Sequence, residues 1–190
     1  MAIVQQSSLP EMINQSRDIL QNPSVPTFER YEQRGTIANA AIYVGVASLI
    51  AALLGIVGGF SGFVSGLLLS LVQFFVFTGA VYFLGKKLYN GSGTWDEVAY
   101  TFSLFIAPLI VVSAALGFVV ALLHWIPLLG GLVGLAGFIV SLILLVVQVY
   151  YAYLAVQSSM NLRDQSQAGI VLGLSFVASF VIMVIVGIIV

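Results

Sequence analysis

Three long stretches of this 190-residue chain contain no charged side chain, and this feature constrains its fold more than any other. The stretches are 35–85, 98–162 and 165–190, with 51, 65 and 26 residues. A helix needs about 20 apolar residues to cross the hydrocarbon core of a bilayer, which is roughly 30 Å thick. The lengths therefore predict two crossings, two crossings and one.

Each of the two longer stretches contains a break of its own. Gly58–Gly62 divides the first, and the segment from His124 through Pro127 to Gly131 divides the second. Backbone polar groups in lipid must bond internally, so only helices or closed barrels cross, and these runs are too long and too continuous for barrel strands. We predict an all-α integral membrane protein, a bundle of five helices near 37–59, 62–84, 96–123, 128–156 and 167–189.

Composition excludes several functional classes. Charged residues make up 7% of the chain, where soluble domains have about a quarter. The chain has no cysteine and one histidine, which excludes the usual zinc and haem sites. Six basic residues and a net charge of −1 argue against nucleic acid as a partner. We expect no cofactor, no metal and no catalytic residue, and we expect a non-enzymatic protein in contact with the lipid bilayer.

The basic residues predict the orientation in the membrane. With five crossings, all six fall on the side of the amino terminus: Arg17, Arg30, Arg34, Lys86, Lys87 and Arg163. Because cytoplasmic loops are enriched in Lys and Arg, this partition predicts a cytoplasmic amino terminus and an outer carboxyl terminus. In a bacterial cell the membrane would be the inner one. We divide the chain into a cytoplasmic segment, 1–35, and a five-helix membrane domain, 36–190.

The amino-terminal segment predicts a short amphipathic helix. Ser8 followed by Glu11 has the form of a capping box, and the helix ends before Pro23. Its apolar side chains fall roughly on one face: Leu9, Met12, Ile13, Ile19 and Leu20. This face either lies in the lipid headgroup region or packs on the ends of the bundle. Beyond it, Pro23, Pro26 and Phe28 predict an extended stretch beside the membrane. Capping patterns also precede two spans, at Thr94 with Glu97 and at Asp164 with Gln167.

One pattern has the form of a catalytic site. Ser61 lies in a Gly-x-Ser-Gly motif like that of rhomboid proteases, and His124 is on the same side of the membrane in the predicted topology. A dyad of these residues is one interpretation. The other, which we favour, is that the glycines form a tight helical hairpin and His124 caps a helix, because the chain lacks a six-helix rhomboid core.

Apart from large apolar side chains, the predicted spans contain small and weakly polar residues. They repeat every four residues along several helices: Ala47, Ala51, Gly55 and Gly59; Gly62, Gly66 and Ser70; Gly130 and Gly134; Gly169 and Gly173. Such stripes allow close helix packing, either inside one bundle or at a seam between copies or partners. Gln73 and Gln148 lie near the middles of two spans and should face a neighbouring helix or a polar cavity, because an unbonded amide in hydrocarbon is costly.

Two further features concern the shape and ends of the spans. Pro108 lies within the third span and should kink it, freeing the Leu104 carbonyl, which Ser103 or a neighbouring helix can satisfy. Tyr150, Tyr151 and Tyr153 lie toward the cytoplasmic end of the fourth span, where they suit an aromatic belt.

These residues together point to a family. The segment from Pro23 to Phe28, the sequence Gly91–Val98 leading to Ala107 and Pro108, the five spans and the 158–168 loop resemble the Yip1-domain proteins, particularly the bacterial members. The resemblance implies a multi-pass membrane protein with a cytosolic amino end. Eukaryotic members act in early secretory trafficking and bind Rab GTPases and each other. Their Asp-Leu-Tyr-Gly-Pro motif is not found in this chain, which puts Rab binding in doubt.

The sequence leaves three functions open. We favour a membrane adaptor or scaffold, a trafficking-type role in which the amino-terminal segment meets a protein partner. The first alternative is an accessory subunit of a larger membrane complex, with association or self-association through the small-residue faces. The second is a passive channel or carrier lined by Gln73, Gln148 and the kink at Pro108.

Overall fold

Five long helices make up most of the chain. The computed structural model describes residues 7–55, 60–126 and 129–189, with all of their side chains except those of residues 60–62, 65 and 189. The long helices are α3 (Ile37–Leu54), α4 (Phe60–Tyr89), α5 (Trp95–Leu123), α6 (Leu129–Ser159) and α7 (Gln165–Ile189). All five are long and apolar enough to cross a membrane. The predicted all-α bundle of five spans is confirmed.

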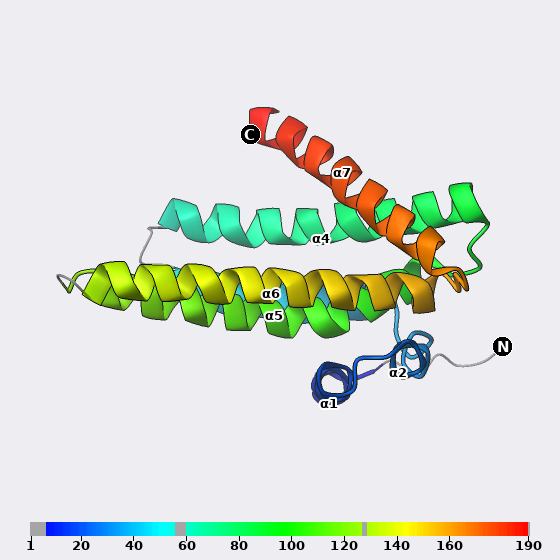
Figure 1. The fold of residues 1–190 in the computed structure, drawn as a ribbon, viewed down its shortest axis with the longest axis horizontal. Helices are drawn as coiled ribbons and strands as arrows, with labels where there is room; N and C mark the ends of the chain where they lie inside the picture. Colours follow the sequence, from blue (N-terminus) through cyan, green and yellow to red (C-terminus); the bar gives the residue numbers. More distant parts are fainter. Residues whose placement is uncertain (1–6, 56–59, 127–128, 190) are drawn as a thin grey trace.

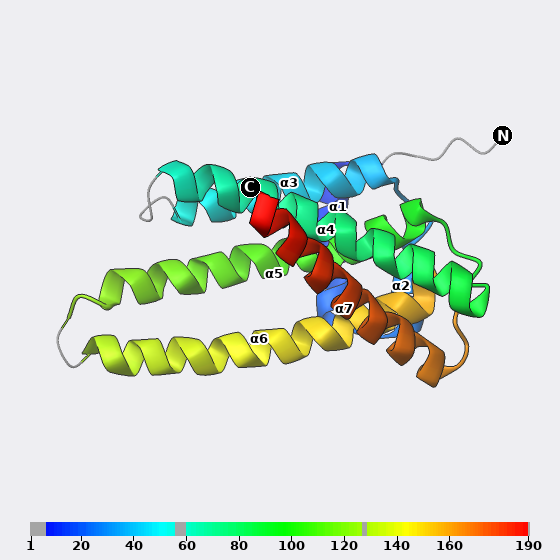
Figure 2. The ribbon, with the colours of Figure 1, turned by 90° about the horizontal axis from the view of Figure 1, so that it is seen from above.

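The five helices form two layers. α3, α5 and α6 lie side by side in one layer, with α5 in the middle, and α4 with α7 covers it (Figures 1 and 2). α7 packs mainly on α4 and diverges from α6 after the loop that joins them (Figure 1). The carboxyl ends of α3 and α5 and the amino ends of α4 and α6 lie at one end of the bundle, which we call the turn end. The loops 90–94 and 160–164 lie at the other end, which we call the charged end.

The helix boundaries follow from local chemistry. The Glu97 amide donates to the Thr94 hydroxyl and the Thr94 amide donates to the Glu97 carboxylate, as predicted. Asp164 caps α7 by accepting a hydrogen bond from the Ser166 amide (2.8 Å).

α4 runs five residues past its predicted end. Its last turn contains Lys86 and Lys87, whose ammonium groups lie over the rings of Tyr82 (5.6 Å) and Phe83 (5.4 Å). Long basic side chains of this kind reach from an apolar helix into the polar interface, so two charges do not end the helix. Asn90, in the left-handed region at φ 53°, then terminates it.

The side chains most shielded from solvent gather toward the charged end. α5 is largely buried from Val98 to Leu109, whereas beyond Val112 many of its large apolar side chains are exposed. α6 shows the same division, with most of its buried residues between Tyr151 and Ser159. The protein core is therefore concentrated in one half of the bundle, and the other half of the α5–α6 hairpin presents apolar side chains to its surroundings.

Two short helices precede the spans. α1 (Leu9–Gln21) begins at Ser8, whose amide donates to the Glu11 carboxylate (2.7 Å) as the capping pattern predicts. α2 (Val25–Glu29) occupies the segment for which we predicted an extended stretch. That prediction was wrong because a proline in the first turn of a helix lacks only an amide hydrogen that would be unbonded there, so Pro26 is compatible with the helix.

Gly93 provides a test of how tightly the loop 90–94 packs on α6. A Cβ atom at this position would overlap the backbone carbonyl of Ser159, whereas at Gly45 it would meet nothing within 4 Å. We expect Gly93→Ala to lower stability by about 1–3 kcal/mol through overpacking, and Gly45→Ala, the matched control, to leave it unchanged or slightly raised. Thermal unfolding in detergent measures both. Equal melting temperatures would contradict the close contact.

Candidate functional site

All six basic and seven acidic residues belong to α1, α2, the segment between α2 and α3, the last turn of α4, the first turn of α5 and the α6–α7 loop, and these elements lie toward the charged end (Figures 1 and 2). In the described part of the chain, the opposite end consists of helix ends without charged side chains. Because polar recognition needs charged or hydrogen-bonding groups, the candidate site lies at the charged end.

Three tyrosines from three different spans hold α1 on the bundle. Tyr43 of α3, Tyr100 of α5 and Tyr151 of α6 all direct their hydroxyl groups at α1. The Tyr43 hydroxyl lies 2.9 Å from that of Ser16, Tyr100 donates to the Gln15 side chain (2.7 Å), and Tyr151 donates to the Leu20 carbonyl (2.8 Å). Neutral hydrogen bonds contribute about 0.5–1.5 kcal/mol each, and buried polar groups left without them cost more. The position of α1 is thus specified from three sides.

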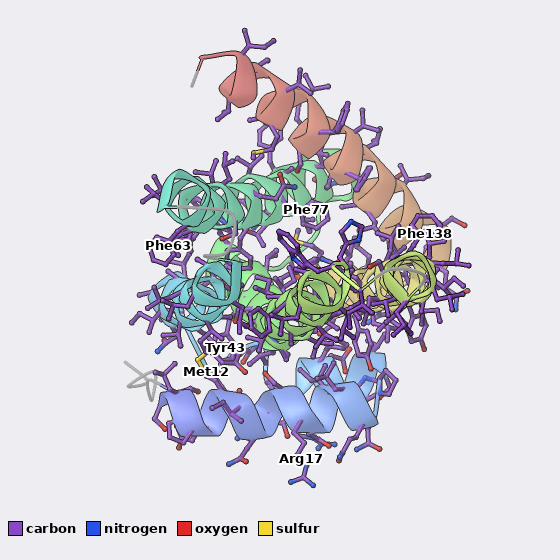
Figure 3. The ribbon with its side chains drawn as sticks, turned by 90° about the vertical axis from the view of Figure 1, so that its left-hand side faces the viewer. Met12, Arg17, Tyr43, Phe63, Phe77 and Phe138 are labelled. Carbon is purple, nitrogen blue, oxygen red and sulfur yellow. The ribbon has the colours of Figure 1, made fainter. Side chains whose placement is uncertain are left out.

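The two faces of α1 differ in exposure. Met12 and Ile19 are fully buried against the bundle, whereas Leu9, Ile13 and Arg17 are exposed on the other side. Figure 3 shows Met12 directed toward the bundle beside Tyr43, and Arg17 directed away from it. The sequence left two alternatives for the apolar stripe of α1, packing on the bundle or lying in the lipid headgroup region. The inner part of the stripe packs on the bundle, and the outer part is exposed.

Phe28 anchors α2 in an aromatic cluster. Its ring is fully buried and meets those of Phe105 (6.2 Å between centroids) and Tyr151 (6.4 Å) edge-on. Phe105 also stacks on Tyr151 (5.9 Å) and packs on Phe102 (5.3 Å). Edge-on and offset-stacked pairs are favourable beyond the area they bury. Tyr151, predicted for an aromatic belt, is therefore a core residue, whereas its neighbour Tyr150 is exposed.

Asp18 joins α1 to the segment after α2. Its carboxylate pairs with Arg30 (3.0 Å) and accepts hydrogen bonds from the Tyr31 hydroxyl (2.8 Å) and the Asn22 amide (2.9 Å). The Tyr31 and Asn22 hydrogen bonds, with a smaller contribution from the Arg30 charge, lower the pKa of Asp18. The carboxylate is therefore ionised at neutral pH and links three side chains.

Glu32 is a buried carboxyl group without a cationic partner among the described residues. It accepts a hydrogen bond from the Ser158 hydroxyl (2.6 Å) near the end of α6. Burial raises the pKa of Glu32, the Ser158 bond opposes that shift, and the nearby acids Glu97 and Glu29 add to it. A buried acid in such surroundings favours its neutral form.

An open cleft lies between α2, the loop 90–94 and the α6–α7 loop. Its volume is about 720 Å³. The lining is mostly polar and comprises Val25, Glu29, Ser92, Gln157, Asn161, Leu162, Arg163 and Gln165. We call it the polar cleft. It brings together residues that are up to 140 positions apart in the sequence, and sequence reasoning did not identify it as a site.

Comparison with known proteins agrees with this architecture. The family model of the Yip1 domain matches residues 17–187, from the middle of α1 nearly to the end of α7. The chain belongs to the Yip1 domain family. No curated protein and no solved structure matches it. The match includes Phe28, Glu32, Tyr100 and Tyr151, so α2 and most of its contacts are part of the family domain. As a member of a membrane family with five apolar helices, this Yip1-domain protein is an integral membrane protein.

The two glutamines of the Yip1-domain spans do not face the bundle interior. Gln73 on α4 and Gln148 on α6 are both exposed at the outer surface of the chain. Neither amide forms a hydrogen bond to another helix within the described chain, because small and apolar side chains of α4 and α6 occupy the interior instead. Within one chain the two amides do not line a cavity between them, and a bond from each to a neighbouring helix stays a prediction.

The small-residue stripes show mixed behaviour. Ala47 and Ser48 are buried, but toward the turn end Gly55 and Gly66 border an open groove of about 210 Å³ between α3, α4 and α5. Gly169 and Gly173 are exposed, while Ala168, Val171, Ser175 and Ser179 form the buried face of α7. Gly59 lies outside the described residues. Gly62 belongs to α4, but its burial lies outside what the structure describes. Close packing is thus not observed at Gly55, Gly66, Gly169 or Gly173.

Pro108 lies inside a continuous α5, where the buried part of that helix ends. The Ser103 hydroxyl donates to the Tyr100 carbonyl (2.7 Å) and not to the Leu104 carbonyl, so that part of our prediction was wrong.

His124 is the exposed residue that ends α5, as expected of a cap, while the Ser61 side chain lies outside the described residues. Within the described part of the chain, no three His, Asp or Glu side chains form a possible metal site.

The raised pKa of Glu32 predicts that the stability of the protein depends on pH. Because its folded-state pKa is raised, the folded chain binds a proton that the unfolded chain releases, and stability falls as the pH rises from the ordinary Glu range through the folded-state pKa. We expect Glu32→Gln, which keeps an acceptor for Ser158, to remove this loss and raise the melting temperature at pH 7.5 by several degrees, at about 2–4 °C per kcal/mol.

Ser158→Ala is the matched variant for this test. It removes the hydrogen bond that favours the carboxylate, so it should lower the melting temperature more at pH 7.5 than at pH 4.5. Melting curves measured in detergent between these pH values report both variants. A Glu32→Gln protein with the same pH dependence as the wild type would contradict the assignment.

Proposed function

We propose that this Yip1-domain protein is a non-enzymatic membrane adaptor that presents the outer face of α1 to a protein partner. The observation that carries this proposal is the difference between the two faces of that helix. One face is held by Met12, Ile19 and the three tyrosine hydroxyls, and the other exposes Leu9 and Ile13 beside Arg17. A helix whose inner face is held in this way offers its outer side chains at low entropic cost.

The outer face has the composition of a small recognition stripe. Leu9, Ile13 and Arg17 are spaced four residues apart and therefore lie in one row along the helix. Ile13 is 58% exposed and, with Leu9, gives this row an apolar part beside the Arg17 charge. An amphipathic partner helix with an acidic position opposite Arg17 fits this row.

Gln73 and Gln148 support a second candidate function, an accessory subunit or self-associating chain. Each amide lies exposed in a membrane-spanning helix. Amides in hydrocarbon seek hydrogen bonds across helices, worth about 1–2 kcal/mol in model peptides. A neighbouring chain that bonds these amides satisfies them.

Site-specific photo-crosslinking tests the adaptor. A benzophenone amino acid at Ile13 should form protein adducts in cells, whereas the same probe at Leu88, another exposed apolar residue toward the charged end, should not. Ile13→Ser should reduce recovery of that partner about tenfold or more, the scale of an interface hot spot. Adducts with lipid alone at Ile13 would contradict the proposal. A partner that survives Ile13→Ser but is lost in Gln73→Leu with Gln148→Leu would favour the accessory subunit.

The proposed orientation places the charged end in the cytoplasm, on the basis of the six basic residues. The chain has no cysteine, so single cysteines report without background. In intact cells an impermeant thiol reagent should label Trp125→Cys in the α5–α6 turn and should label Ser92→Cys only after permeabilisation; both residues are exposed. Ser92 is preferred to its neighbour Gly93 for labelling, because a side chain at Gly93 would meet α6. Labelling of Ser92→Cys in intact cells would reverse the orientation.

A further inference from the structure

The polar cleft contains charges of both signs that are not used by the fold. Glu29 and Arg163 both line it, and neither forms an ion pair with another described residue. Arg30, next to Glu29 in the chain, is by contrast paired with Asp18. An acid and a base that face the same cleft without pairing are complementary to a molecule that has a negative and a positive group of its own.

The remaining lining suits the same kind of molecule. Ser92, Gln157, Asn161 and Gln165 offer hydroxyl and amide groups, which both donate and accept hydrogen bonds. A phosphate bound at a guanidinium has further oxygens that need donors, and an ammonium bound at a carboxylate has further hydrogens that need acceptors. The cleft provides both in its neutral walls.

The walls of the cleft are held in place by helix ends. Asn161 adopts the left-handed conformation (φ 53°), and the Leu162 amide donates to the Gln157 carbonyl (3.1 Å), which closes α6. Asp164 then caps α7, so Arg163 lies on a short link between two capped helices. On the other side, Glu29 follows Phe28, whose buried ring fixes α2. A site between such elements requires little reorganisation on binding.

The position and size of the cleft indicate a ligand at the membrane surface. It lies where α6 ends and α7 begins, and this is the boundary between the apolar spans and the charged end. Lipid phosphates lie at this depth, outside the hydrocarbon core. Its volume of about 720 Å³ is in the range of small-molecule sites.

We propose that the polar cleft binds a phosphoethanolamine group, with the phosphate at Arg163 and the primary ammonium at Glu29. A purely anionic headgroup satisfies Arg163 but meets the Glu29 carboxylate with an oxygen, which is repulsive. A quaternary ammonium has no N–H to donate to that carboxylate. The phosphoethanolamine group belongs either to a phosphatidylethanolamine lipid or to a soluble ester. The proposal is independent of the partner proposed for α1.

Binding to the purified full-length protein in detergent tests this assignment. Native mass spectrometry is performed with phosphatidylethanolamine, phosphatidylglycerol or phosphatidylcholine added singly at equal concentration. We expect one phosphatidylethanolamine to bind in preference to the other two lipids. Arg163→Gln and Glu29→Gln should each weaken it about tenfold or more, as expected for loss of a charge-assisted hydrogen bond. Soluble O-phosphoethanolamine, titrated separately, distinguishes the two sources: binding of the diacyl form alone assigns a lipid, and binding of both with equal affinity assigns the soluble ester.

Arg34→Gln is the matched control, because Arg34 is an exposed arginine that does not line the cleft. It should bind phosphatidylethanolamine as the wild type does. Two results would overturn the proposal. One is an equal loss in Arg34→Gln and Arg163→Gln, which would mean that only general surface charge matters. The other is phosphatidylglycerol binding at least as tightly as phosphatidylethanolamine and unaffected by Glu29→Gln.

Discussion

A charged or unbonded polar group in the hydrocarbon core of a bilayer costs free energy, and this constraint divides the molecule into two unlike ends. Because the charged side chains all gather toward one end, that end also contains the residues that can pair, cap and hydrogen-bond. α1 and α2 pack there through Phe28, Ile19 and the tyrosine hydroxyls, and the best-packed part of the bundle lies beneath them. The turn end, with no charge to organise, consists of helices that present apolar side chains to lipid.

The charged end uses its polar groups in two ways. Asp18, Asp96 and Glu97 are engaged in local structure: Asp18 links α1 to the segment after α2, Asp96 accepts a hydrogen bond from the Ile37 amide at the start of α3, and Glu97 caps α5. Glu29 and Arg163 differ from these acids, because both border the polar cleft and neither pairs with another described residue. Two unpaired charges of opposite sign at one cleft are what distinguish the site that we propose for a zwitterionic group.

Within the membrane spans, the polar side chains differ in their exposure. Interior positions of α7 are small or weakly polar, such as Ser175 and Ser179, while glutamines face outward on α4 and α6. Small hydroxyls fit between closely packed helices, whereas a longer amide needs a partner of matching reach. Within the described residues, the amides of Gln73 and Gln148 have no hydrogen-bond partner, so the surface of the spans and the surface of α1 are separate candidates for contact with other proteins.

The sequence alone determined the all-α membrane fold, the five spans, most helix starts and the Yip1 resemblance. These properties depend on charge spacing, apolar length and capping residues, all of which are local. It did not determine that Pro26 lies in a helix, that Tyr43, Tyr100 and Tyr151 converge on α1, or that Glu32 is buried beside Ser158. Those contacts join residues 27 to 131 positions apart, and an apolar span has no period that shows which face meets a neighbour. Only the tertiary structure decided them, because the same helices can satisfy lipid in many rotations and only one rotation brings these hydroxyls and rings together.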